Sequence, residues 1–260
     1  MLIAVHHAIN PIQVRVSIES IFLQKNIPNQ IIIVVDGSIG IELSEYLSHL
    51  SINYNQIVIF YLKENKGLAY ALNYGLQKSN YELIARLDPD DIVVNNRFLE
   101  QKKEFDENQT LSVCGSYAQE ICKNNKKKLL KKPSKDNEIK VSLKIKNPII
   151  HSTVMFKKSD IQSIGGYPLI YKCQDYLLWI KCMENNLIFK NIDKALVVSK
   201  LDKSLMMRRD LNYFRFEKII YNYMLEKKII NKFFFYLNIL FRFILRSLPY
   251  PIKFLLYQIR

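Results

Sequence analysis

The chain has 260 residues, enough to bury one large α/β core or two small ones. Hydrophobic residues make up 49% of the sequence, which favours a globular protein and excludes an intrinsically disordered chain. The formal net charge of +14 is strongly basic, a balance typical of proteins that bind nucleic acid or an anionic membrane.

The positive charge is concentrated in the second half of the chain. Residues 1–120 carry 9 basic and 14 acidic side chains, whereas residues 121–260 carry 29 and 10. The sequence contains no zinc-finger spacing, no RNP signature and no heptad zipper, so we do not expect nucleic acid as a partner. We therefore expect the basic half to contact an anionic membrane surface.

Two features of the sequence favour a cytoplasmic chain. The opening apolar run, Met1–Val5, is too short for a secretory signal and lacks a basic region and a cleavage site. The four cysteines form no CxxC pair and have no metal-ligand spacing with the histidines, as expected for reduced, structural thiols.

The first third of the chain alternates between predicted strands and helices. Apolar runs favour strands at Leu2–Val5, Gln30–Val35 and Gln56–Leu62, and helical spacing of apolar residues favours helices at Val14–Gln24 and Gly67–Lys78. This repetition predicts a parallel sheet covered by helices on both faces. In such a sheet the ligand lies beyond the carboxyl ends of the strands.

The next predicted strand runs into an acidic loop within Glu82–Asp91. The segment begins as an apolar run and ends in Asp88, Asp90 and Asp91. Three close carboxylates repel one another unless a cation lies among them, and carboxylate oxygens suit Mg²⁺ or Mn²⁺ bound to a diphosphate. The alternative is a solvated turn or a helix N-cap. Asp36 also follows a predicted strand, so both acidic sites are expected in one crevice, although Asp36 also suits a simple strand-end turn.

The middle of the chain continues the mixture of strands and helices. Lys123–Lys135 holds seven lysines and is expected to be a solvated hairpin tip or loop. The other predicted elements are helices at Asn95–Asp106, Ser159–Ile164 and Asp175–Glu184, and strands at Leu111–Ile121, Ile149–Phe156, Leu187–Phe189 and Ala195–Val198.

The pattern of apolar and charged residues changes near the C-terminus. Residues 210–228 have the pattern of an amphipathic helix, and residues 229–260 alternate large apolar groups with Lys and Arg. The apolar run Phe233–Phe241 is too short, and its surroundings too charged, for a spanning helix. We predict an interfacial helix on a membrane, with a helical cap on the core as the alternative. The predicted division is residues 1–205 and residues 206–260.

Several short motifs follow one another in a fixed order. They are IIIVVDGS at Ile31–Ser38, NKGLAYALNYGL at Asn65–Leu76, HSTVMF at His151–Phe156, GGY at Gly165–Tyr167 and QDYLLW at Gln174–Trp179. With the acidic run, this set resembles the family 2 glycosyltransferases, and most closely the amylovoran-type galactosyltransferase branch of bacterial surface-polysaccharide enzymes. The resemblance covers roughly the first two hundred residues. It implies an α/β GT-A fold, with a mixed sheet flanked by helices, followed here by a basic amphipathic helical extension.

The resemblance also implies a donor site. Asp88 and Asp90 are matched to the Asp-x-Asp pair that faces the metal, Mg²⁺ or Mn²⁺, and Asp36 to the residue that accepts hydrogen bonds from the nucleoside. Many relatives have two consecutive acids there, and here Val35 replaces the first. The other expected donor-binding residues are Asn65, Lys66, Gly67 and Arg86. An arginine on an apolar strand is costly unless a carboxylate or a phosphate pairs with it.

On the acceptor side, the resemblance matches Asp175 to the catalytic base that takes the proton of the acceptor hydroxyl. Gln174 stands where relatives have Glu, and a plain N-cap is the alternative role for Asp175. His151 and Trp179 are weaker acceptor-side candidates. Each of them also has a purely structural interpretation, and Trp179 suits core packing as well as it suits stacking on a sugar.

The resemblance implies an inverting glycosyltransferase that moves a sugar from a UDP-sugar, with galactose as the leading donor sugar. The expected acceptor is a polyprenyl-diphosphate-linked saccharide at the cytoplasmic face of the bacterial inner membrane, in O-antigen, capsule or exopolysaccharide synthesis. One alternative is a nucleotidyltransferase acting on sugar phosphates, although its glycine-rich signature is missing near the first strand. The other is a non-catalytic membrane-binding module, which would leave the acids without a purpose.

Overall fold

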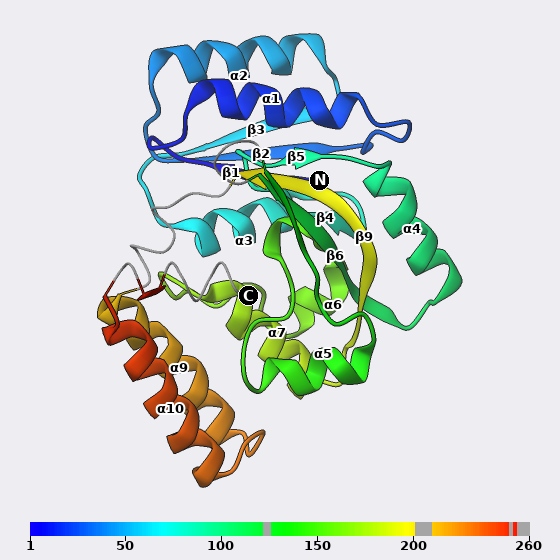
Figure 1. The fold of residues 1–260 in the computed structure, drawn as a ribbon. Coiled ribbons are helices and arrows are strands. Elements are labelled where there is room, and N and C mark those ends of the chain that lie inside the picture. The colour runs from blue at the N-terminus through cyan, green and yellow to red at the C-terminus, as the bar shows by residue number, and fades with distance from the viewer. Residues whose placement is uncertain (122–125, 201–209, 250–251, 254–260) are drawn as a thin grey trace.

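The computed structural model describes residues 1–121, 126–200, 210–249 and 252–253 (Figure 1). Its N-terminal part is a parallel sheet of three strands in the order β1 (Leu2–Val5), β2 (Ile31–Asp36) and β3 (Ile57–Leu62). β1 and β2 are buried along their whole length, as expected for strands whose residues are apolar at every position.

Helices cover both faces of this sheet, as the sequence predicts. α1 (Pro11–Phe22) and α2 (Ile41–Asn53) lie above the sheet in Figure 1, and α3 (Leu68–Lys78) lies below it. Because successive side chains of a strand point to opposite faces, β2 contributes to both cores. Ile31, Ile33 and Val35 pack in the core with α1 and α2, and Ile32 and Val34 pack in the core with α3.

A second, mixed sheet continues the first. Its strands lie in the order β4 (Leu83–Ala85), β8 (Met155–Lys157), β6 (Leu111–Ile121), β9 (Ile188–Lys200) and β5 (Ile92–Val93). β6 and β9 run parallel, and the other pairs along this order are antiparallel. A parallel bridge between Leu2 and Arg86 joins β4 to β1, and the Leu87 N–H donates to the Leu2 carbonyl at 3.3 Å. The mixed α/β sheet flanked by helices is therefore confirmed.

Some predicted elements differ from the observed ones. The predicted strand at Ile149–Phe156 is wrong in its first half, where η2 (His151–Thr153) is a 3₁₀ turn. The Thr153 hydroxyl accepts from the Ser116 N–H at 3.1 Å and donates to the Ile150 carbonyl at 2.8 Å, which favours the turn over a strand. The two short strands predicted after residue 186 form one strand, β9, because register shifts opposite Ser116 and Tyr117 absorb the irregularity.

The lysine-rich segment forms half of a hairpin. β7 (Lys127–Leu130) pairs with β6 in antiparallel register, from Ala118 opposite Leu130 to Ile121 opposite Lys127. The predicted tip of this hairpin falls on residues 122–125, which lie outside the described residues. The remaining core helices are α4 (Arg97–Glu107), α5 (Asp136–Leu143), α6 (Lys158–Ser163) and α7 (Gln174–Glu184).

Two C-terminal helices form a hairpin that packs against α7. α9 (Leu211–Glu226) begins at the N-cap Asp210, and α10 (Lys232–Ser247) begins at the N-cap Asn231. Tyr221 and Met224 of α9 are fully buried in the same core as Trp179 of α7. The predicted boundary between residues 205 and 206 falls in the segment 201–209, outside the described residues, and stays a prediction.

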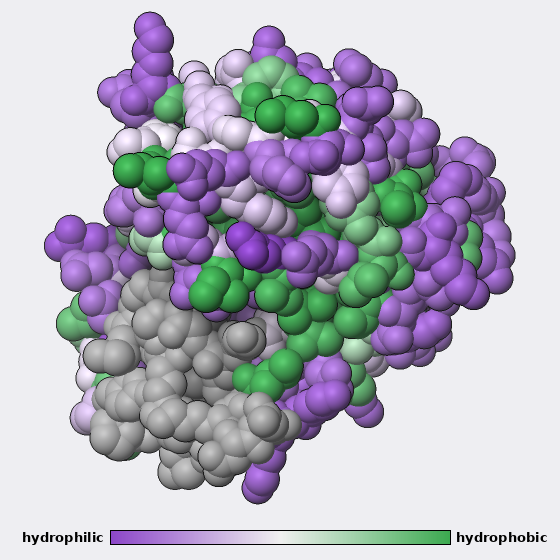
Figure 2. Space-filling view, turned by 90° about the horizontal axis from the view of Figure 1, so that it is seen from above, coloured by the Kyte–Doolittle hydropathy of each residue, from purple (hydrophilic) through white to green (hydrophobic). Residues whose placement is uncertain are grey.

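The molecule seen from above has a mainly hydrophilic outer margin, and hydrophobic groups gather nearer its centre (Figure 2). Exposed apolar side chains on the upper helices are scattered, among them Ile12, Leu23, Ile41 and Ile52. Isolated apolar groups of this kind are normal on a soluble surface and carry no functional signal.

A buried polar clamp holds the central strands together. Arg97 of α4 is fully buried, and its guanidinium donates to the backbone carbonyls of Arg86 at 2.7 Å and Val154 at 2.9 Å. Gln101 accepts from Arg97 Nε at 2.9 Å and donates to the carbonyls of Cys114 and Thr153. Because these carbonyls belong to buried backbone, the clamp satisfies groups that would otherwise be unpaired.

We expect Gln101→Ala to lower the free energy of unfolding by about 3 kcal/mol, because it leaves two buried carbonyls and one arginine N–H without their partner. Lys102→Ala, one position along the same helix, removes only an exposed i,i+4 ion pair and should change stability by less than about 0.5 kcal/mol. Urea denaturation followed by circular dichroism measures both. Equal effects of the two substitutions would contradict the clamp.

Candidate active site

The end of β2 and the loop before α3 form the first part of the site. The two carboxylate oxygens of Asp36 accept hydrogen bonds from the backbone N–H groups of Lys66, at 2.7 Å, and Gly67, at 2.9 Å. Asn65 Nδ2 donates to the Asp36 carbonyl at 3.3 Å. Gly37 has φ of +84°, and a Cβ there would lie 2.8 Å from the Asn65 nitrogen. The residues predicted to bind the donor around Asp36 are thus brought together.

This arrangement places a carboxylate against the N-terminus of α3, where the helix dipole favours negative charge. Asp36 is 4% exposed, whereas the Lys66 side chain is 41% exposed. The structure therefore gives Asp36 a structural task that the sequence did not indicate, since it holds the Asn65–Gly67 loop. Each carboxylate oxygen has a second lone pair, so this task is compatible with contact to a nucleoside.

The end of β4 carries a buried arginine. Arg86 is 2% exposed and forms an ion pair through Nη2 with Oδ1 of Asp88. Within the described part of the chain, its Nε and Nη1 have no hydrogen-bond partner. Although burial by itself lowers the pKa of Arg86, the charge and hydrogen bond of Asp88 raise it above its ordinary value. A permanently charged guanidinium with unused donors is suited to binding an anion.

The three acids after β4 lie in different environments. Asp88 has a side chain that is 38% exposed, Asp90 is exposed, and Asp91 is buried. Burial, reinforced by the charge of Asp88, raises the pKa of Asp91 to about 8, although a hydrogen bond with Ser152 lowers it. The Asp91 N–H donates to the Asp88 carbonyl at 3.1 Å, which closes the turn. Asp88 and Asp90 are therefore accessible to a ligand, whereas Asp91 is buried.

Asp175 lies in the first turn of α7, as predicted. Asn147 Nδ2 donates to its Oδ2 at 2.7 Å. Burial raises the pKa of Asp175, and four influences lower it: the backbone N–H of Tyr176, the charge of Arg86, the Asn147 hydrogen bond and the backbone N–H of Asp175 itself. A carboxylate whose pKa is raised but which remains hydrogen-bonded is typical of a general base. Asn147 was missed from the sequence, where its only signal is the Asn-Pro step before HSTVMF.

The other acceptor-side candidates form a packed aromatic group. His151 Nε2 lies 3.0 Å from the Tyr167 hydroxyl, and burial together with the charge of Arg86 lowers the pKa of His151 well below its ordinary value. Trp179 is fully buried with its ring centroid 6.3 Å from that of His151. The idea that Trp179 stacks on a sugar is wrong, because its indole lies in the core. Gln174 is 8% exposed and begins α7.

The loop that carries Tyr167 is fixed to α3. Asn73 accepts from the Tyr167 N–H at 2.8 Å and donates to the Tyr167 carbonyl at 2.8 Å. Gly166 has φ of +69°, and a Cβ there would lie 2.5 Å from Asn73 Oδ1, so only glycine fits. Tyr167 belongs to the GGY motif that the sequence analysis singled out, whereas Asn73 was not identified from the sequence.

Arg86 lies at the electrostatic centre of these groups. Its charge influences the pKa values of Asp91, His151, Tyr167 and Asp175, which come from widely separated parts of the sequence. The acids after β4 and the acid of α7 are therefore brought together around one cation. Asp36 lies at the same edge, because β2, β1 and β4 run parallel and their carboxyl ends meet there.

The acids after β4 have the chemistry of a divalent-cation site that a ligand completes. Among the described residues, no group of three or more His, Cys, Asp and Glu side chains is placed to hold a metal ion. Mg²⁺ is usually bound through one or two carboxylates plus substrate phosphates, and Asp88 and Asp90 supply two accessible carboxylates. These residues therefore fit a cation that is bound together with a diphosphate.

The sheet order, the helices on both faces and the strand-end acids define the GT-A class of transferase. The crystal structure of TarS from S. aureus superposes with a TM-score of 0.67 at 14% identity, over 94% of this chain and 42% of that one. TarS 1–349 in complex with UDP superposes with a TM-score of 0.61 at 14% identity, over 86% of this chain and 65% of that one. At this identity the likeness concerns the fold alone.

Sequence comparison identifies the family. Residues 4–196 match the family described as "Glycosyl transferase family 2", and the chain belongs to this family. It is 33% identical over 182 residues to an Escherichia coli "UDP-Gal:alpha-D-GlcNAc-diphosphoundecaprenol beta-1,3-galactosyltransferase", covering 69% of this chain and 66% of that protein. It is 29% identical over 180 residues to "Amylovoran biosynthesis glycosyltransferase AmsE" of Erwinia amylovora, covering 69% and 67%.

These matches confirm the resemblance to the amylovoran-type branch and make the nucleotidyltransferase and binding-module alternatives unnecessary. The chain spans about two thirds of the length of these relatives. A third relative, "O-antigen biosynthesis glycosyltransferase WbnJ" of Escherichia coli, is 34% identical over 168 residues, covering 64% of this chain and 65% of that protein. Members of family 2 generally use a divalent cation.

Proposed function

We propose that this protein is an inverting glycosyltransferase that moves a sugar from a UDP-sugar to a saccharide on a lipid diphosphate. Galactose is the leading donor sugar. The observation that carries the proposal is the gathering of Asp88, Asp91 and Asp175 around Arg86 in a family 2 chain. The names of the relatives support the donor, the lipid-linked acceptor and a setting in surface-polysaccharide synthesis. UDP in the TarS complex supports the nucleotide.

The donor is bound along the edge where β2 and β4 end. Asp36 and the Asn65–Gly67 loop face the nucleoside, and Lys66 and the unused N–H groups of Arg86 pair with the diphosphate. Asp88 and Asp90 would hold a Mg²⁺ or Mn²⁺ ion, which would supply Lewis-acid stabilisation of the charge on the leaving diphosphate.

The acceptor hydroxyl attacks the anomeric carbon while Asp175 takes its proton. The oxygen–carbon bond to the acceptor forms as the carbon–oxygen bond to UDP breaks, so one displacement inverts the configuration. Asn147 orients the Asp175 carboxylate through its hydrogen bond. Burial raises the pKa of Asp175, as a base that acts near neutral pH requires. His151 and Gln174 remain proposed contacts on the acceptor side, with His151 fixed by Tyr167.

A lipid-diphosphate acceptor requires the enzyme to work at a membrane, and a UDP-sugar donor favours the cytoplasmic face of the bacterial inner membrane. No helix in the described ranges 1–121, 126–200, 210–249 and 252–253 is long and apolar enough to cross a bilayer. The proposed association is peripheral because the basic half complements an anionic membrane surface.

The donor proposal is tested by thermal unfolding with nucleotides and Mn²⁺. UDP with Mn²⁺ should raise Tm by about 5 °C when UDP is present at about 100 times its Kd, because it binds only the folded state. UDP without a divalent cation, or a nucleoside triphosphate with Mn²⁺, should raise it much less. Asp88→Asn should remove the difference that Mn²⁺ makes. Equal stabilisation of the wild type with and without the metal would contradict the two-carboxylate site.

Asp175→Asn should lower kcat for transfer by about a hundredfold to ten-thousandfold, because the amide cannot take the proton. Binding of UDP, measured by calorimetry, should be unchanged. Asp193→Asn, at an exposed position on β9, is the control and should leave kcat unchanged. Substantial turnover by the Asp175 variant would show that another group takes the proton.

Asn147→Ala should move the acid side of the pH–rate profile to higher pH. The Asn147 hydrogen bond lowers the pKa of Asp175, so its loss raises that pKa and leaves less carboxylate at a given pH. The measurement is kcat/KM for transfer between about pH 5 and 9. Asn80→Ala, at an exposed position, should leave the profile unmoved. An unshifted profile for Asn147→Ala would mean that Asp175 is not the group observed.

A further inference from the structure

Helix α10 packs two arginines against the protein and exposes several large apolar side chains, which is the opposite of the usual arrangement in an amphipathic helix. Its arginines face the protein: Arg246 is 9% exposed, and the Arg242 side chain is 12% exposed. Five of its large apolar side chains face away from the protein and are about half exposed or more, namely Phe233, Leu237, Leu240, Phe241 and Ile244. A helix that caps a soluble core places its apolar stripe inward. α10 therefore presents an apolar face that the described residues, 1–121, 126–200, 210–249 and 252–253, leave exposed.

An internal ion-pair network fixes this orientation. Arg246 donates to Glu217 of α9 through Nε at 2.9 Å and Nη2 at 2.6 Å, and Arg242 Nη1 lies 3.3 Å from the same carboxylate. Arg242 also donates to the Ile145 carbonyl at 2.5 Å and to the Tyr221 hydroxyl at 3.3 Å. If α10 rotated to bury its exposed apolar side chains, Arg242 and Arg246 would move away from Glu217. The Glu217 carboxylate would then be buried without its partners, which is costly.

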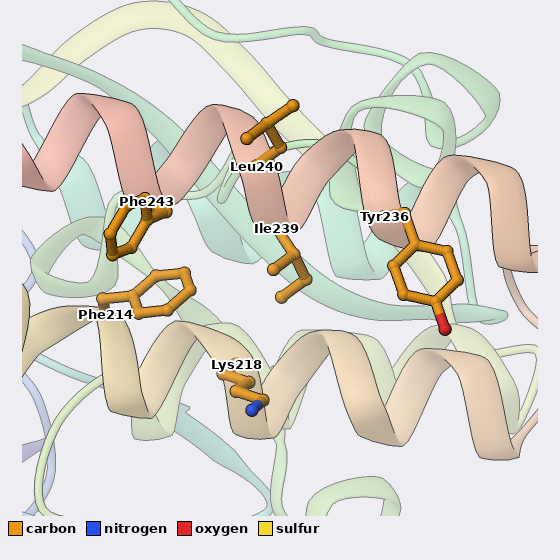
Figure 3. A pocket seen from close by; sticks show the side chains of 6 residues that line it. All are labelled: Phe214, Lys218, Tyr236, Ile239, Leu240 and Phe243. Atoms are coloured by element: carbon orange, nitrogen blue, oxygen red, sulfur yellow. The ribbon is translucent and has the colours of Figure 1, made fainter.

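The same hairpin contains a groove of about 430 Å³ between α9 and α10 (Figure 3). The figure shows Phe243, Ile239 and Tyr236 pointing from α10 toward α9. The rings of Phe243 and Phe214 close one end, with centroids 5.8 Å apart. Lys218 of α9 and Leu240 complete the lining. The groove continues the outer apolar face and has one cationic group at its border.

Exposed charge on the hairpin is mostly positive. The exposed basic side chains are Arg215, Lys218, Lys227, Lys228 and Lys232, and Lys227 pairs with Glu184 of α7. The acidic residues in the same stretch are Asp210 at the helix N-cap, Glu217 inside the network, and exposed Glu226. An apolar face bordered by positive charge complements the surface of an anionic bilayer.

We propose that the outer face of α10, with the groove beside Lys218, is the surface by which this protein lies on an anionic membrane. The apolar side chains enter the boundary between headgroups and acyl chains, and the lysines contact lipid phosphates. The arginines stay inside the protein and do not reach the headgroups. A second copy of the chain is disfavoured on this surface, because two hairpins of the same positive charge repel each other.

This inference deepens the proposed function by naming the membrane-binding surface, and its biological purpose rests on that function. The two are tested separately. Vesicle binding does not require catalysis, and the UDP-dependent rise in Tm does not require a membrane. Loss of one with retention of the other identifies which proposal fails.

The test is cosedimentation of the full chain with vesicles of phosphatidylcholine containing about one third phosphatidylglycerol. The wild type should bind these vesicles, should not bind pure phosphatidylcholine, and should bind less at about 0.5 M salt than at about 0.1 M. The double variant Leu240→Glu, Phe241→Glu should bind at least about tenfold more weakly, because two exposed apolar groups become anionic. Lys218→Glu with Lys232→Glu should have a similar effect.

Matched controls lie on other faces of the molecule. Leu23→Glu with Ile52→Glu replaces two apolar side chains that are 83% and 80% exposed near the ends of α1 and α2, and should bind vesicles as the wild type does. Lys102→Glu with Lys103→Glu on α4 controls for charge. All variants should keep the wild-type circular dichroism spectrum and the UDP-dependent rise in Tm.

Three results would overturn the proposal. The wild type does not bind anionic vesicles, or the Leu240, Phe241 variant binds them as well as the controls do. Alternatively, the wild type is a dimer by light scattering and this variant alone is a monomer, which would assign the face to a second copy.

Discussion

The buried ion pair between Arg86 and Asp88 is the interaction on which the site depends. A guanidinium that is 2% exposed persists only where carboxylates offset the loss of water, and here the acids after β4 supply them. Asp88 accepts a hydrogen bond from Nη2 of Arg86. Within the described chain, Nε and Nη1 of Arg86 have no hydrogen-bond partner. The free protein therefore holds a cation whose pairing is incomplete. In the proposed function, a diphosphate would pair with these unused donors, and Asp88 would then be available to hold a divalent cation.

This cation is built into the sheet. Arg97 donates to the Arg86 carbonyl from below, and its own pKa is lowered to about 9 by burial and by the charge of Arg86. The two buried arginines repel each other. Neutral partners, namely Gln101 and the strand carbonyls, hold Arg97 in place against this repulsion. The rigidity of the site thus comes from a polar cluster beneath it, and the apolar layers on either side of the sheet hold that cluster in place.

The sequence predicts those parts of the fold that local patterns encode, and misses those that tertiary contacts decide. The end of β2 at Asp36, and the acidic loop that follows β4, were predictable because apolar runs stop there. α2 was missed although Leu43, Leu47 and Leu50 have helical spacing, so its signal was present and went unread. Asn147 could not be found in this way, because only the fold brings it to Asp175. Trp179 was placed equally well in the core or on a sugar, since helical periodicity does not say which neighbour covers an aromatic face.

The hairpin and the proposed base share one anchor. The Ile145 carbonyl accepts from the Tyr221 hydroxyl at 2.7 Å and from Arg242 of α10, and Asn147, two residues further along, holds Asp175. The side chains that turn the apolar face of α10 outward are therefore bonded to the segment that orients the carboxylate. A chain lying on a bilayer through α10 then has its base at a fixed angle to the membrane, as an acceptor tethered by a lipid requires. In the proposed membrane-bound state, attraction of the basic second half to lipid phosphates would act on a hairpin that is hydrogen-bonded to the segment beside the site.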